Sequence, residues 1–205
     1  MKTRIFVVLV LFLSINLLAQ NDTKNHLISI GDINLNGYLA LNGKYTSYES
    51  NGAGFLDFRA AIVFDNGWAV GFDASGLYYD KKLNALVKDG TYHVEAGYAG
   101  FYIEKIFSVT ENLKVSISLL MASGLAKYRY DKEYREQKVW YQEIIDQTNF
   151  FVTEPTVEIQ QRIAGNWWIG LNGSYRNTSP IKMIQTDENM LKKFNAGLTF
   201  KYGIF

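Results

Sequence analysis

The chain has 205 residues, of which 48% are hydrophobic, 15% aromatic and 20% charged, with 17 Gly, 2 Pro and no Cys. This composition excludes an intrinsically disordered chain, a disulfide-bonded scaffold and any site that depends on a thiolate. Lys and Arg total 21 against 20 Asp and Glu, which is not the basic excess of a nucleic-acid-binding protein. We therefore expect one folded domain without a nucleic-acid partner.

The N-terminus has the pattern of an export signal. A basic start and an apolar run at 5–13 precede Ala19, a small residue suited to cleavage. The run is too short to cross a bilayer as a helix, and no later segment reaches the ~18 continuous apolar residues that a membrane helix needs. We predict a cleaved signal peptide at 1–19 and a mature domain at 20–205, with an uncleaved anchor as the alternative.

The rest of the chain alternates apolar and polar residues with a period of two, the pattern of strands with each face in a different environment. The Asn-Gly pair at 66–67 predicts a tight turn. Pro155 interrupts one segment, and we expect a bulge or a kink there because Pro has no N–H group. The eight predicted strands are 32–45, 56–64, 68–78, 92–102, 114–121, 151–163, 167–176 and 194–202.

The predicted links alternate between short and long, with the long ones more polar. In an up-and-down meander all the short links then lie at one end, as in transmembrane barrels with short periplasmic turns. The fold class is therefore predicted to be all-β, an eight-stranded antiparallel up-and-down transmembrane β-barrel with its N-terminus at the periplasm. The short links lie near 65–67, 108–112 and 164–166, and the long ones near 47–53, 79–91, 130–148 and 177–192.

In this prediction the apolar faces contact lipid and the polar faces line the interior. On strand 92–102 the alternation places Tyr98 and Tyr102 toward lipid. Eight strands leave an interior just wide enough for side chains, and buried charges must be paired, so we expect a plugged barrel without a solute channel. The predicted luminal charge network comprises Asp57, Arg59, Asp73, Glu95, Glu154, Glu158, Arg162 and Arg176.

Aromatic residues gather toward both ends of the predicted strands, as two membrane–water interfaces would select. Trp68 and Trp167 follow short turns, whereas Tyr78, Tyr92 and Tyr175 lie toward the long links. We predict that these five residues are interface aromatics. Ordinary packing within a sheet is the alternative, because Tyr and Trp favour strands in any protein.

Three segments resemble known proteins. The segment 194–205 resembles the terminal strand of Gram-negative outer-membrane barrels, which finish on an aromatic residue, and the segments 97–105 and 151–176 are similar to a family of small, mostly uncharacterised outer-membrane β-barrel proteins. The resemblance implies the fold, outer-membrane lipid around it, and insertion by the barrel assembly machinery. It brings no catalytic residues. Phe205 departs from the pattern, because it has the parity of Lys201 on the polar face.

Few residues could carry chemistry. His26 and His93 are the only histidines, which excludes a histidine-rich metal site, and no cofactor is predicted. Ser75, His93 and Glu95 share a predicted face, so a Ser–His–Glu lipid hydrolase could be drawn from them. A histidine bonded within the luminal network is the favoured interpretation.

The segment 131–148 mixes charges with exposed aromatic residues, which favours a surface that contacts a partner. Tyr134, Trp140 and Tyr141 are the candidate contact residues, and a β-hairpin extension is the alternative. We predict a protein that is not an enzyme but is structural, contacts other surfaces, or serves as an accessory subunit of a larger envelope complex. The alternatives are a secreted lipocalin-like carrier, an outer-membrane lipid hydrolase and a narrow pore.

Overall fold

A computed structural model of the protein describes most of the chain after residue 27. Within the described part, no helix has the length and apolarity needed to cross a bilayer. The predicted signal peptide at 1–19 lies outside this part, so its cleavage stays a prediction. The described residues are 28–30, 33–48, 51–79, 91–131, 142–184 and 186–205.

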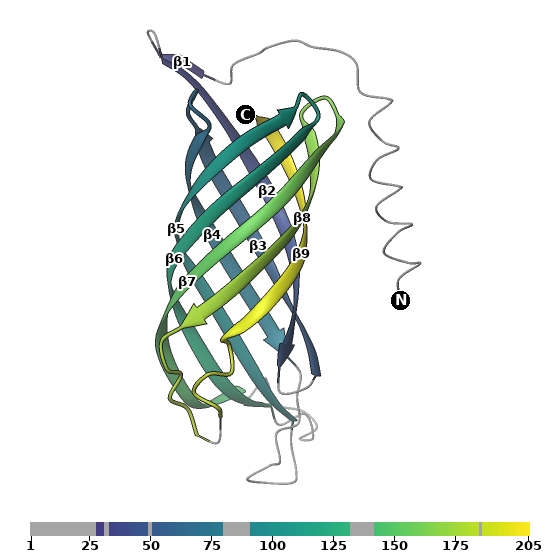
Figure 1. Ribbon diagram of the computed structural model, residues 1–205. Coiled ribbons are helices and arrows are strands. Elements are labelled where there is room, and N and C mark those ends of the chain that lie inside the picture. Colours follow the sequence, from purple (N-terminus) through teal and green to yellow (C-terminus); the bar gives the residue numbers. More distant parts are fainter. Residues whose placement is uncertain (1–27, 31–32, 49–50, 80–90, 132–141, 185) are drawn as a thin grey trace, which may run out of the picture.

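Eight antiparallel strands, β2 to β9, close into a barrel in which each strand pairs with its sequence neighbours and β9 pairs with β2 (Figure 1). The closing register runs from Gly37 opposite Ile204 to Thr46 opposite Asn195. The predicted fold class is confirmed. A short strand that the alternation did not predict, β1, pairs with the start of β2. The strands are β1 Ile28–Ile30, β2 Ile33–Tyr48, β3 Asn51–Val63, β4 Trp68–Tyr79, β5 Thr91–Thr110, β6 Leu113–Asp131, β7 Gln142–Ala164, β8 Trp167–Thr178 and β9 Lys193–Ile204.

The two ends of the barrel differ. Of the seven links between successive barrel strands, three of two to four residues lie at one end, which we call the turn end, and the other four lie at the loop end. At the turn end the Asn66–Gly67 turn forms as predicted, with Gly67 at φ 77°, a conformation that favours glycine. Short turns mark the periplasmic side of such barrels. The link predicted as long at 47–53 is in fact only residues 49–50, because the small residues after it continue the strand.

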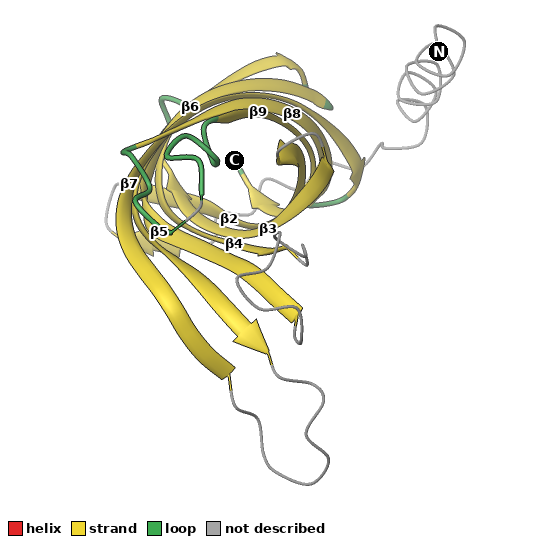
Figure 2. Ribbon diagram, turned by 90° about the horizontal axis from the view of Figure 1, so that it is seen from below, coloured by secondary structure: helices red, strands yellow, loops and turns green. Residues whose placement is uncertain are grey.

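Three strands are longer than the others. Strands β5, β6 and β7 contain 20, 19 and 23 residues, whereas the other barrel strands contain 12 to 16. Strand β7 pairs with β8 only from Val152 onward, so the β6–β7 hairpin continues past the loop-end rim. Figure 2 shows this hairpin leaning away from the ring. The link predicted at 130–148 is therefore shorter, since strand structure extends to Asp131 and resumes at Gln142.

Pro155 does not cause the predicted bulge. Its partner on β6 is Leu119, within an unbroken register. On the β8 side the pairing skips Glu154 and Pro155 and resumes at Thr156 in the same register. The missing N–H group therefore removes ladder pairing without shifting the strand. The register shift between β7 and β8 lies instead between Arg162 and Ala164.

Seven of the eight barrel strands direct apolar residues outward and polar residues inward, as predicted. On β3, Leu56, Phe58 and Ile62 are 65%, 47% and 50% exposed on the outer surface. A lipocalin-like carrier needs these side chains around an internal ligand, so that alternative is wrong. The outer surface instead forms an apolar band suited to lipid.

Strand β5 is the exception, and its two faces are the reverse of the prediction. Tyr98 and Tyr102 point into the lumen, where each is 3% exposed, while Phe101 is 69% exposed outside. The phenol hydroxyl explains the orientation, because Tyr98 donates a hydrogen bond to the luminal Glu154 at 2.8 Å. As a result Glu95 lies on the outer face and does not belong to the luminal network, contrary to the prediction.

Candidate functional site

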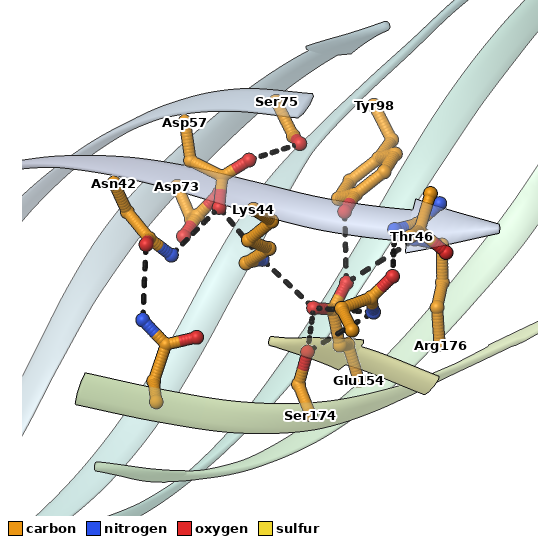
Figure 3. A network of polar contacts seen from close by, with 12 residues as sticks. Asn42, Lys44, Thr46, Asp57, Asp73, Ser75, Tyr98, Glu154, Ser174 and Arg176 are labelled. Carbon is orange, nitrogen blue, oxygen red and sulfur yellow. Dashed lines mark hydrogen bonds and ion pairs between the residues drawn. The ribbon is translucent and has the colours of Figure 1, made fainter. Parts of the chain in front are cut away.

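Polar side chains fill the lumen in two groups, of which the first lies nearer the loop end. We call this group the loop-side cluster, formed by Lys44, Asp57, Glu154 and Arg176 with the hydroxyl groups around them (Figure 3). The Lys44 Nζ atom lies 2.6 Å from Asp57 Oδ2 and 2.7 Å from Glu154 Oε1. One ammonium group thus joins carboxylates from β3 and β7, on different sides of the barrel.

Glu154 is the centre of the loop-side cluster. Besides Lys44, it accepts hydrogen bonds from Tyr98 at 2.8 Å and from Ser174 at 2.6 Å, and Arg176 Nε lies 3.5 Å away. Arg176 also donates to Asn195 Oδ1 at 2.6 Å. A buried carboxylate with this many donors has its charge well compensated.

The second group, the turn-side cluster, is formed by Tyr38, Arg59, Asp73, Tyr102, Glu104, Glu158 and Lys201. Its cation Lys201 lies between two carboxylates, with Nζ 3.3 Å from Glu158 Oε1 and 3.7 Å from Glu104 Oε1. Tyr38 donates a hydrogen bond to Glu104, and its hydroxyl lies 2.6 Å from that of Tyr102. Aromatic hydroxyl groups therefore hold much of this cluster in place.

A chain of hydrogen bonds through Asn42, Asn172 and Thr199 connects the two groups, from Asp57 to Glu158. Arg59 lies within the turn-side cluster. Its Nε donates to Asp73 at 2.9 Å, and its Nη1 lies 4.0 Å from Glu158 Oε2. The guanidinium carbon also lies 4.8 Å from the centre of the Tyr102 ring. The polar contacts thus follow the barrel axis, which supports a lumen filled by side chains.

The turn end of the lumen is closed by an aromatic group. The Phe205 ring lies 5.3 Å from Tyr38 and 5.1 Å from Trp168, measured between ring centres. Lys114 donates to the backbone oxygen of Phe205, and its Nζ lies 4.4 Å from that ring. Phe205 therefore faces the lumen, as its parity indicates, and not the lipid.

The structure brings most of the predicted luminal residues together. Asp57, Arg59, Asp73, Glu154, Glu158 and Arg176 are at most 3% exposed inside the barrel, and Arg162 lies at the turn end, 4.9 Å from the Trp168 ring centre. The prediction did not include Lys44, Glu104 and Lys201. Lys44 and Lys201 lie on polar faces that the alternation identifies, whereas Glu104 lies beyond residue 102, where the predicted strand ends.

The predicted interface aromatics are only partly described. Trp68, Trp167 and Tyr175 are 42%, 51% and 38% exposed on the outer surface. The side chains of Tyr78 and Tyr92 lie outside the described residues. The same is true of the predicted partner-contact residues Tyr134, Trp140 and Tyr141.

The Ser–His–Glu arrangement does not hold together. Ser75 points into the lumen and donates a hydrogen bond to Asp57, while Glu95 lies on the outer face of the neighbouring strand. The sheet separates these two side chains, and the His93 side chain lies outside the described residues. In the part of the chain that the structure describes, no three acidic or histidine side chains are placed to hold a metal ion.

The link between β8 and β9 packs into the loop end. Ile181 and Leu191 are buried there, and the Ile184 amide donates to Asp146 Oδ2 of β7 at 2.8 Å. The Ser179 amide donates to the Phe151 carbonyl oxygen at 2.9 Å. This segment therefore covers part of the mouth of the barrel and is fastened to the base of the β6–β7 extension (Figure 2).

The outer face of β5, β6 and β7 changes character toward the loop end. Its apolar band includes Phe101, Met121 and Phe151, all at least half exposed. Farther out, residues that carry a charge or an amide lie side by side across the three strands. We call this loop-end part of the outer face of β5, β6 and β7 the platform. One such row is Glu95, Lys127 and Gln147, which are direct neighbours across the three strands, and farther along β7 Ile144 is 46% exposed.

Comparisons with known proteins agree with this architecture. Searches of protein-family models and of curated proteins found no match. Among solved structures, the chain is similar to a major outer membrane protein from Thermus thermophilus, with a TM-score of 0.53 and 10% identity over 82% of this chain and 99% of that one.

Two further structures are similar at lower scores. Ail, the attachment invasion locus protein of Yersinia pestis, has a TM-score of 0.48 and 9% identity over 82% of this chain and 96% of its own. Neisserial surface protein A has a TM-score of 0.47 and 9% identity over 83% of this chain and 96% of its own. Identities this low show the fold alone. With its apolar outer band and charged lumen, the protein is a β-barrel of the bacterial outer membrane.

Proposed function

We propose that this outer-membrane β-barrel is a non-conducting, non-catalytic anchor that presents the platform to a partner outside the membrane. The single observation behind the proposal is the continuation of β5, β6 and β7 past the apolar band. Strands that only had to cross the lipid would have no need of this length, since about 9–11 residues suffice. The row Glu95, Lys127 and Gln147 gives the extension a polar outer face.

The edge of the extension supports the same function. Before Val152, strand β7 pairs with β6 but not with β8, and at Phe151 its other edge bonds Ser179, so within the described chain the edge available for strand pairing lies before Phe151. Asp146 occupies part of that edge by accepting hydrogen bonds from the Gln147 and Ile184 amides. An exposed strand edge is a common docking point for an extended peptide. A surface-contact role therefore uses both the face and the edge.

Photo-crosslinking in intact cells tests this proposal. A photoreactive amino acid at Gln147 or Asn149 samples the platform, and one at Leu198 samples the lipid-facing band as a matched control. We expect adducts with a surface protein or saccharide only from the platform positions. Protein adducts from Leu198 alone would instead favour an accessory subunit embedded beside a larger envelope complex, and would contradict the proposal.

The absence of conduction has its own test. Because paired side chains fill the lumen, planar-bilayer recordings of the purified barrel should show no discrete openings. Steady single-channel steps from the wild-type protein would contradict the proposed anchor role and support the narrow pore.

A further inference from the structure

A groove of about 480 Å³ lies on the lipid-facing surface near the turn end. Its walls are the outward side chains of Leu39, Ile62, Val70 and Tyr202, which come from β2, β3, β4 and β9. Its volume lies within the roughly 300–1,000 Å³ of small-molecule sites. The groove is therefore a dent in the apolar band and is large enough to hold part of a ligand.

The groove follows from small residues at two neighbouring cross-strand rows, each made of residues that lie opposite one another on adjacent strands. In one row Gly37 stands between Ile62 and Ile204 and contributes no side chain. In the next row Ala60 stands between Phe72 and Leu39 and contributes only a methyl group. A Cβ atom at Gly37 would lie 2.7 Å from the Ala61 carbonyl oxygen, so the backbones approach closely at this point.

The cation Lys105 lies near the turn-end side of the groove. Lys105 points outward from β5, with its Nζ 2.5 Å from the Asn66 carbonyl oxygen and 5.3 Å from the centre of the Trp68 ring. Asn66 belongs to the turn that joins β3 and β4, the two strands that carry Ile62 and Val70. Val70 lies three positions after Gly67 of that turn, or roughly 10 Å at about 3.3 Å per residue.

This combination matches the chemistry of one lipid class. An ammonium group beside an interfacial Trp attracts a phosphate ester, and an apolar dent about 10 Å deeper in the bilayer suits an acyl chain. An ammonium has three donors, and the Asn66 oxygen takes one of them. We infer that the barrel binds one glycerophospholipid of the periplasmic leaflet, with its phosphate on Lys105 and an acyl chain in the groove. This inference does not depend on the platform.

Native mass spectrometry of the full chain in mild detergent provides the test. The probes are dioleoylphosphatidylglycerol and dioleoylglycerol, which have the same acyl chains but differ in the phosphate. We expect the wild type to bind the phosphatidylglycerol more tightly. Lys105→Gln should weaken that binding about two- to fivefold, the scale of an exposed ion pair. It should leave dioleoylglycerol binding unchanged.

A second variant tests the groove. Ala60→Leu fills the dent from its outward side and should weaken the binding of both probes about threefold or more, through lost van der Waals contact. Lys127→Gln and Ala74→Leu are matched controls on the outer surface and should bind as the wild type does. Equal binding of the two probes by the wild type, or equal losses in the controls, would overturn the inference.

Discussion

The two luminal clusters use similar residues but are held together differently. In the loop-side cluster, Lys44 lies within 2.7 Å of two carboxylates and Glu154 accepts several hydrogen bonds. In the turn-side cluster, Lys201 lies 3.3 and 3.7 Å from its carboxylates, and its Nζ has no hydrogen-bond partner among the described residues. We therefore expect the geometry around one central acid, and not charge balance alone, to set how much each cluster stabilises the barrel.

The largest expected effect comes from Glu154→Gln. This change removes one of the two carboxylates that compensate Lys44 and also the carboxylate that pairs with Arg176, and breaking a buried pair on one side costs about 3–5 kcal/mol. Urea unfolding in lipid vesicles, followed by tryptophan fluorescence, measures the change in the free energy of unfolding. A smaller loss than that caused by Glu158→Gln, the matched change in the turn-side cluster, would contradict the view that the loop-side cluster stabilises the barrel more.

The next effect separates the lumen from the lipid face. Leu198→Arg should cost about 2–4 kcal/mol, because Leu198 faces lipid and an Arg near the midplane is destabilising. The neighbouring Thr199→Arg should instead disturb the lumen, where Thr199 donates to Glu158 at 3.0 Å. Unfolding in bilayers of two thicknesses distinguishes them, and only the Leu198→Arg cost should depend on thickness.

Glu158→Gln is the matched change in the turn-side cluster. We expect a cost of about 1–3 kcal/mol, because Glu158 makes longer ion pairs and Lys201 keeps Glu104 as a partner. The same unfolding assay compares it directly with Glu154→Gln. Equal costs for the two variants would mean that the clusters do not differ in strength.

The smallest effect is expected for Glu95→Ala. Because Glu95 lies on the outer face and outside both clusters, the change in the free energy of unfolding should be about 1 kcal/mol or less, as for surface ion pairs. A loss comparable to that of Glu158→Gln would place Glu95 back in the lumen and contradict the reversed faces of β5.

Much of the fold could be predicted from alternation. On β3, Asp57 and Arg59 alternate with Leu56 and Phe58, so each face has one chemical character and the orientation follows. The turn at Asn66–Gly67 followed from the backbone freedom of glycine. For the segment 131–148 the sequence supports a β-hairpin extension only as an alternative, because the period of two is interrupted where Ile144 and Ile145 are adjacent.

The reversal of β5 has a clear physical cause. Tyr98 and Tyr102 are amphipathic, so their presence on one face indicates neither lipid nor lumen. The informative residues lie later in the strand, where Glu104 alternates with Ile103 and Lys105. Because the predicted strand stopped at residue 102, Glu104 was left out, and with it an acid of the turn-side cluster.

The contact between Lys44 and Glu154 also bears on how the protein assembles. The two residues are 110 positions apart, on β2 and β7, and they can meet only after most of the strands have paired. Until then, Lys44 can pair only with Asp57 on the neighbouring β3 and Glu154 only with Arg176 on the neighbouring β8, so each half of the network is incompletely compensated, at a cost that grows as water is displaced. Non-local closure of this kind is slow. The ionic interior therefore stabilises the fully closed barrel late in folding and destabilises partly paired intermediates inside the bilayer.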